Sequence, residues 1–177
     1  MLERLRLLLP PPAEPIEVGR PDGWAGVEAS MGTGLPEDFK AFTELYGSGK
    51  VDDFLYLFNP FAEGQDGNLL FEKDRVLAAY AETRAKFPER LPLPPFPEPG
   101  GVLPLGRTDN GDEFYWATGG APGDWPVVLL ASRAARQELH GMPVTGFLAA
   151  LAAGELATRV LPDELVRRPT HRFTPFG

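Results

Sequence analysis

The hydrophobic positions of the chain follow a helical spacing in four segments. Apolar side chains recur every three or four residues at 24–31, 35–46, 69–87 and 144–153, which places them on one face of a helix. A glycine follows three of these segments and can end a helix there. We therefore predict four amphipathic helices whose apolar faces enter the core. The predicted core residues on these helices are Trp24, Phe39, Phe42, Tyr46, Phe147 and Leu148.

A strand pattern dominates residues 103–131. Asn110-Gly111 predicts a two-residue type I′ hairpin, because this turn needs a positive φ at both central residues. Aromatic β-formers at 113–118 and an apolar run at 125–131 predict two further strands. The Gly- and Pro-rich residues 119–124 separate them as a turn. This stretch is the predicted centre of the sheet.

Other segments extend this sheet. Residues 51–59 are predicted to form one strand with apolar side chains on both faces, and such a strand is covered on both sides. Side chains alternate between the faces of a strand, so Tyr115 and Trp116 cannot both face a single core; we predict that Trp116 is the core residue. The polar residues 132–141 fit either an edge strand or a short helix.

The 177 residues are enough for one domain with a substantial core. We predict a single α+β domain at 24–154, with a mostly antiparallel β-sheet flanked by helices. Residues 1–23 are predicted to form an N-terminal arm and loop, and residues 155–177 a C-terminal tail that packs on or trails from the domain. Six prolines at 88–101 predict an extended loop; a polyproline ligand segment is the alternative there.

The formal net charge of −8 makes nucleic acid an unfavourable direct ligand, because phosphate binding requires clustered Lys and Arg. An acidic protein instead favours basic partners, although the same acidity could serve only solubility. The absence of cysteine suits a reducing cytoplasm. No stretch reaches the roughly 20 apolar residues needed to cross a bilayer. We predict a cytoplasmic protein with no membrane association; the sequence does not fix its oligomeric state, and a monomer is favoured over an oligomer.

The candidate partner-binding residues lie at the ends of the predicted strands. Turns on a rigid sheet are suitable places for recognition, carboxylates can steer a basic partner, and an exposed tryptophan can anchor the contact. The candidates are Asp52, Asp53, Asp109, Asp112, Glu113, Asp124 and Trp125.

No combination of residues in the sequence points to catalysis. His140 and His171 are the only histidines and are far apart in the chain, without the H-E-x-x-H pattern of a zinc site. Gly47–Lys50 lacks the first glycine and the final Ser or Thr of a phosphate-binding loop. Asp109–Asp112 is too short for a calcium loop. We predict that the protein is not an enzyme and has no catalytic, cofactor-binding or metal-binding residues. The alternative is a small hydrolase with an unrecognised site.

Several motifs occur in an order that resembles a known family. The first is Trp24-x-x-Val27-Glu28-x-x-Met31-Gly32-x-x-Leu35-Pro36-x-Asp38-Phe39-Lys40-x-Phe42, followed by Tyr46-Gly47-x-Gly49. The later ones are Leu103-Pro104-Leu105-Gly106, Asn110-Gly111-Asp112-x-x-Tyr115-Trp116, Val127-Val128 and Phe147-Leu148-x-x-Leu151-x-x-Gly154. Together they make residues 24–154 similar to the SUKH superfamily, also called the SMI1/KNR4 family.

The resemblance implies the same α+β fold, with a mostly antiparallel sheet flanked by helices. It also implies a role in protein binding. Bacterial members of that family are immunity proteins that bind and block polymorphic toxins, often nucleases, and fungal relatives are regulatory hubs. The expected function is therefore that of an immunity protein that neutralises a cognate toxin, with a basic nuclease domain as the expected partner. The alternative is a regulatory or scaffold module with no toxin partner.

Overall fold

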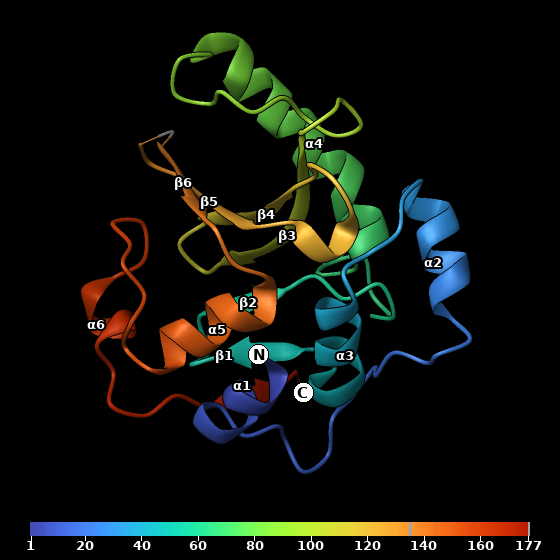
Figure 1. Cartoon of the computed structure of the whole chain (residues 1–177), viewed down its shortest axis with the longest axis vertical. Coiled ribbons are helices and arrows are strands. Elements are labelled where there is room, and N and C mark those ends of the chain that lie inside the picture. The colour runs from blue at the N-terminus through green and yellow to red at the C-terminus, as the bar shows by residue number, and fades with distance from the viewer. Residues whose placement is uncertain (135, 177) are drawn as a thin grey trace.

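The structure, a computed structural model, describes residues 1–134 and 136–176, and these form a single α+β domain (Figure 1). Seven strands form one sheet in the order β6-β5-β4-β3-β2-β1-β7, and neighbouring strands are antiparallel. The strands are β1 (Gly49–Val51), β2 (Leu55–Leu57), β3 (Val102–Thr108), β4 (Glu113–Ala117), β5 (Val127–Ala131), β6 (Arg136–His140) and β7 (Phe173–Pro175). The predicted fold class is confirmed.

The four predicted helices appear close to their predicted bounds, and two shorter helices precede and follow them. They are α1 (Leu2–Leu8), α2 (Trp24–Met31), α3 (Glu37–Tyr46), α4 (Leu69–Lys86), α5 (Val144–Ala152) and α6 (Asp163–Val166), and a 3₁₀ turn, η1, spans Pro122–Asp124. The start of α4 is fixed by Asn68, whose side chain accepts a hydrogen bond from the Leu70 N–H at 2.9 Å. The helix predicted from residue 35 begins at Glu37, because Pro36 has extended backbone angles.

One face of the sheet packs against α3 and α5. Phe114 and Trp116 of β4 point to this face, where the Phe39 ring meets Trp116 at 4.9 Å and the Phe147 ring meets Phe114 at 5.7 Å. Figure 1 shows α1, α3 and α5 together in its lower half, whereas α4 crosses its upper part. The residues predicted for the core are all at most 5% exposed: Trp24, Phe39, Phe42, Tyr46, Trp116, Phe147 and Leu148.

The other face of the sheet packs against α4. Tyr115 points to this side, where its ring lies 5.4 Å from the ring of Tyr80. Tyr115 and Trp116 are therefore both fully buried. The prediction that only one of them could be inside was wrong, because helices cover both faces of the sheet.

The turn between β3 and β4 differs from the predicted one. Gly111 has a φ of +82°, but Asn110 has no positive φ. The Gly111 N–H donates to the Thr108 carbonyl, and the Thr108 N–H donates to the Asp112 carbonyl, at 2.9 and 2.8 Å. This closes a loop of three residues with glycine in the left-handed position, a common alternative to the two-residue hairpin. The hairpin is confirmed and its type I′ turn is corrected.

The predicted strand at 51–59 is interrupted by a turn between β1 and β2. Asp52 and Asp53 have φ values of +54° and +55°, and the Phe54 N–H donates to the Val51 carbonyl at 3.1 Å. Two successive positive φ values define the type I′ combination, and aspartate tolerates the left-handed region better than most residues. The tight turn predicted at Asn110 thus occurs at Asp52 instead.

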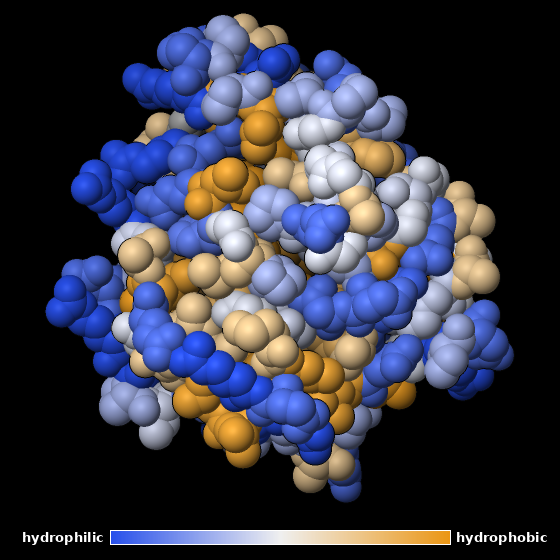
Figure 2. Space-filling view, in the orientation of Figure 1, coloured by the Kyte–Doolittle hydropathy of each residue, from blue (hydrophilic) through white to orange (hydrophobic). Residues whose placement is uncertain are grey.

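Both ends of the chain belong to this packed structure. Helix α1 buries Leu5, and the Tyr46 hydroxyl donates to the Leu9 carbonyl at 2.6 Å. Strand β7 pairs with β1 at the edge of the sheet. Figure 2 shows apolar residues on either side of hydrophilic ones in the region of α1. Leu7 of this helix is largely exposed. None of the helices in the described residues is both long and apolar enough to span a bilayer.

Candidate functional site

Asp52 was a candidate partner-binding residue, but its side chain is only 2% exposed. Its Oδ2 lies 2.6 Å from His171 Nδ1, and its Oδ1 accepts a hydrogen bond from the Arg172 N–H at 3.1 Å. The carboxylate therefore fastens the C-terminal segment to the β1–β2 turn, which corrects the predicted surface role. The adjacent Asp53 is exposed and lies 3.3 Å from Arg172.

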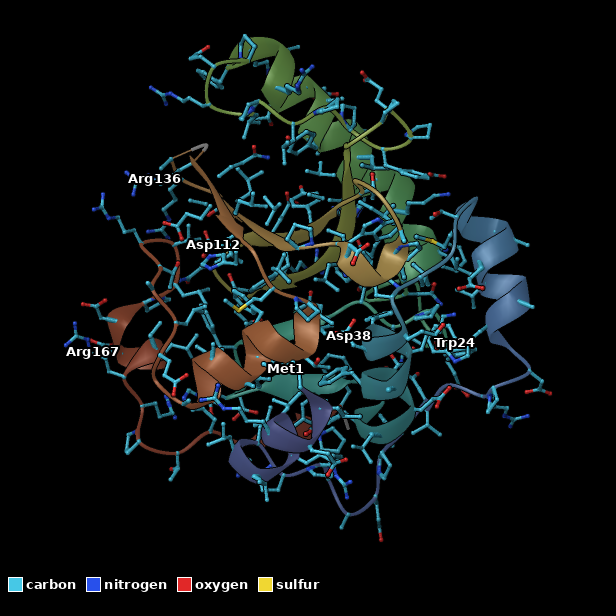
Figure 3. All side chains as sticks on the ribbon, in the orientation of Figure 1. Met1, Trp24, Asp38, Asp112, Arg136 and Arg167 are labelled. Atoms are coloured by element: carbon cyan, nitrogen blue, oxygen red, sulfur yellow. The ribbon has the colours of Figure 1, made fainter. Side chains whose placement is uncertain are left out.

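Asp112 is also buried, against the prediction. Its Oδ1 accepts hydrogen bonds from the N–H and the hydroxyl of Ser132, at 3.0 and 3.1 Å, and its Oδ2 accepts one from the Thr108 hydroxyl at 3.2 Å. In Figure 3, Asp112 lies inward of Arg136. The side chain thus ties the β3–β4 turn to the end of β5, and it is not available to a partner.

Trp125 is a core residue instead of an exposed anchor. It is 4% exposed, and its ring lies 6.3 Å from that of Trp116. Its neighbour Asp124 is exposed in η1. Asp109 is exposed at the opposite end of β4 and forms an ion pair with Lys50 at 2.7 Å. Five residues of β4 separate these two ends by roughly 17 Å, so the acidic strand ends do not form one surface.

Glu113 is the remaining candidate, and it points to the α4 face. Its Oε2 accepts a hydrogen bond from the Tyr115 hydroxyl. Burial raises the pKa of Glu113 above that of an ordinary glutamate, although the Tyr115 hydroxyl and the nearby Arg75 and Arg107 act in the opposite direction. The carboxyl group also lines a cavity of about 220 Å³ between α4 and the sheet.

A polar network lies beside Glu113 under α4. Glu72 is 3% exposed and pairs with the guanidinium of Arg75. Arg107 of β3 approaches the same carboxylate to 4.0 Å, and its Nε donates to the Tyr56 hydroxyl. Charged groups are seldom buried unless they are paired, and each group here has a partner. The Glu72–Arg75 pair lies within α4, and the approach of Arg107 is the charged contact of this network between α4 and the sheet.

Several acidic residues that form no ion pair within the described part of the chain lie on two loops, at 14–22 and 61–68. The Glu63 N–H donates to Glu17 Oε1 at 2.8 Å, which joins the loops. The indole of Trp24 donates to Glu44 Oε1 at 2.8 Å and brings α3 to the same place. We call this region the acidic loop surface, formed by Glu17, Asp22, Glu44, Glu63 and Asp66.

Two features of the acidic loop surface suit protein contact. Ile16 and Val18 are partly exposed on the first loop, and Arg20 is the only basic residue in the two loop sequences. The sequence alone does not reveal this surface, because its acids come from three segments that are separated by 19 positions or more. The available signal was the pair of acidic segments, Glu14–Glu17 and Glu63–Asp66, within loops rich in Gly or Pro.

Among the residues that the structure describes, no three His, Cys, Asp or Glu side chains are grouped to hold a metal ion. Comparison of the chain with models of known protein families, with curated proteins and with solved structures gives no match. The similarity to the SUKH superfamily therefore remains a prediction from the motifs in residues 24–154.

Proposed function

We propose that this chain is an immunity protein that binds a basic toxin domain through the acidic loop surface and thereby blocks it. The observation that carries the proposal is the exposure of Asp22, Glu63 and Asp66 without an ion pair among the described residues. Carboxylates that are free of internal partners can pair with Lys and Arg of another protein and can accelerate its association.

The chemistry of the expected partner supports this role. A nuclease must present Lys and Arg to the phosphates of its substrate. An acidic surface complements such a basic cleft and competes with the nucleic acid for it. Ile16 and Val18 add apolar area beside the acids, and protein interfaces combine an apolar centre with a polar rim. The surface thus has both parts that inhibition by occlusion requires.

The test begins with the genes that neighbour the one for this chain, and it uses the toxin domain that the proposal expects one of them to encode. Co-expression with this chain should restore growth to cells that make the toxin domain, and the purified proteins should associate faster at low salt. A triple variant, Asp22→Lys, Glu63→Lys and Asp66→Lys, should slow association by about tenfold or more and reduce its salt dependence, because it reverses the steering charges.

A control variant with the same change in net charge distinguishes an effect of the acidic loop surface from an effect of the net charge of the whole protein. Glu98→Lys, Asp124→Lys and Asp163→Lys alter exposed acids outside the acidic loop surface and should slow association much less. Equal slowing by both triple variants would show that net charge alone matters. A chain that gives no protection against the toxin but captures a regulatory protein of its own cell would support the regulatory or scaffold module instead.

A further inference from the structure

The cavity beside Glu113 has the dimensions of a site for one side chain. It lies where the β3–β4 turn and the end of β5 face α4, and its volume is about 220 Å³. Sites for drug-sized ligands occupy roughly 300 to 1,000 Å³. The walls are formed by Ala79 and Thr83 of α4, together with Gly111, Leu130 and Ser132. Gly111 and Ala79 leave the space open, because both have small side chains.

The hydroxyl groups of this cavity already donate to the protein. The Thr83 hydroxyl donates to the Ala79 carbonyl at 2.9 Å, and that of Tyr80 to the Leu93 carbonyl at 2.7 Å. The Ser132 hydroxyl shares its proton between the Asn110 carbonyl and Asp112 Oδ1, each at 3.1 Å. Their protons are therefore unavailable to a ligand. The lone pairs of Thr83 and Ser132 remain as possible acceptors.

Glu113 adds the strongest acceptor. Its Oε2 is occupied by the Tyr115 hydroxyl, whereas no side chain or backbone donor among the described residues bonds to its Oε1. A cavity that offers acceptors and no free hydroxyl donor matches a group that only donates. Among side chains, the ammonium of lysine and the guanidinium of arginine are such groups.

The walls favour the guanidinium over the ammonium. Leu130, Ala131 and Ala79 give the cavity apolar sides, and a planar guanidinium is more weakly hydrated than a compact ammonium. We propose that this cavity receives an arginine side chain of the partner protein, whose guanidinium donates to Glu113. The identity of that partner as a basic toxin rests on the function proposed above, but the chemistry of the cavity does not.

The charges around Glu113 leave room for another cation. Arg75 and Arg107 are near, but Arg75 is paired with Glu72, and Arg107 is directed to Tyr56 and Glu72. Because burial raises the pKa of Glu113, the free protein retains this proton to a higher pH than usual. An entering guanidinium favours the ionised carboxylate. Arginine binding should therefore release a proton and weaken as the pH falls.

The test is an NMR titration of the full chain with N-acetyl-arginine amide. The backbone amide signals of Gly111, Ser132 and Thr83 should shift saturably, at millimolar concentrations of this small probe. N-acetyl-citrulline amide is the matched control, because it has nearly the same shape but no charge, and it should bind at least tenfold more weakly. Arginine shifts no larger than those from citrulline would overturn the proposal.

Two variants of the protein locate the binding. Glu113→Gln removes the charge at nearly constant size and should weaken arginine binding at least tenfold, whereas Glu82→Gln, on the exposed side of α4, should leave it unchanged. Ala79→Leu should abolish the shifts by filling the cavity, and leucine is a good helix former, so α4 should persist. Arginine binding that survives in both Glu113→Gln and Ala79→Leu would overturn the assignment.

A lysine probe and the toxin itself complete the design. Binding of N-acetyl-lysine amide as tight as that of the arginine probe would overturn the preference for a guanidinium. The toxin assay with the acidic loop variants is independent of these titrations. Toxin binding without arginine binding would therefore refute the cavity assignment alone, and arginine binding without toxin binding would refute the toxin partner alone.

Discussion

The two faces of the sheet are both covered by helices, yet they are built from different chemistry. Under α3 and α5 the contacts are between aromatic rings, such as Phe39 on Trp116 and Phe147 on Phe114. Under α4 a buried carboxylate, Glu72, is paired with arginine, and a cavity opens beside the sheet. The first face can hold the fold together by packing. The second face can therefore carry polar groups for recognition on a backbone that is already fixed.

The largest expected effect is on the aromatic face. Trp116→Ala should reduce the free energy of unfolding by about 3 to 5 kcal/mol, because it removes a fully buried ring and leaves a cavity. Tyr115→Phe on the opposite face removes only the hydroxyl that donates to Glu113 and should lower the free energy of unfolding by about 0.5 to 3 kcal/mol. Urea unfolding measures both changes. If Trp116→Ala lost less stability than Tyr115→Phe, the aromatic face would not be the main source of stability.

A smaller effect is expected from the charged network. Glu72→Ala should lower the free energy of unfolding by about 1.5 to 3 kcal/mol, since it removes a charged hydrogen bond within α4 and the contact of this carboxylate with Arg107 of the sheet. The loss stays below that of a fully buried ion pair because Arg75 is more than half exposed. Asp74→Ala, at an exposed neighbouring position, is the control and should change stability by less than about 0.5 kcal/mol. Equal losses from both variants would argue against a structural network.

The features predicted well from the sequence are those with local causes. The end of α2 at Gly32 and the start of α4 at Asn68 depend on residues next to the helix. The amphipathic spacing likewise acts within one turn. Such elements were found within one or two residues, because periodicity and capping need no knowledge of the rest of the fold.

The exposure of the acidic residues could not be predicted in this way. Asp52 is buried by His171, which lies 119 positions later in the chain, and Asp112 is buried by Ser132, 20 positions later. Tyr115 is buried because α4 forms a second covering layer. In each case the partner is distant in sequence. The sequence therefore places Asp52 and Asp112 correctly in polar turns, but it does not show that their side chains are buried.

Glu113 offers a test of the polar face by pH. Its pKa is raised in the folded protein, chiefly by burial, so the folded state holds this proton more tightly than the unfolded state. The bound proton stabilises the folded state below a pH of about 4.3, which is the pKa of glutamate in the unfolded chain. This stabilisation is lost as the pH rises through the pKa of Glu113 in the folded protein. Glu113→Gln should therefore unfold at a higher urea concentration than the original protein at pH 7, with the difference disappearing near pH 3.5. A difference that is constant with pH would mean that titration is not its cause.

The smallest expected effect is a pH dependence of opposite sign on the aromatic face. His140 lies 5.2 Å from the ring of Phe147, and burial lowers its pKa, while Glu138 partly opposes this shift. The folded state then binds the proton less tightly than the unfolded state. The stabilisation is present above the unfolded pKa of about 6.5 and is lost as the pH falls through the folded value. Urea unfolding of His140→Gln should show a weaker loss of stability on acidification across this interval, because glutamine does not titrate.

The double variant His140→Gln, Glu113→Gln tests both faces at once. Its free energy of unfolding should vary less with pH at both the acidic and the neutral end, since the two groups lie on opposite faces and share no partner among the described residues. Non-additive slopes would instead show that the polar and aromatic faces are coupled through the sheet.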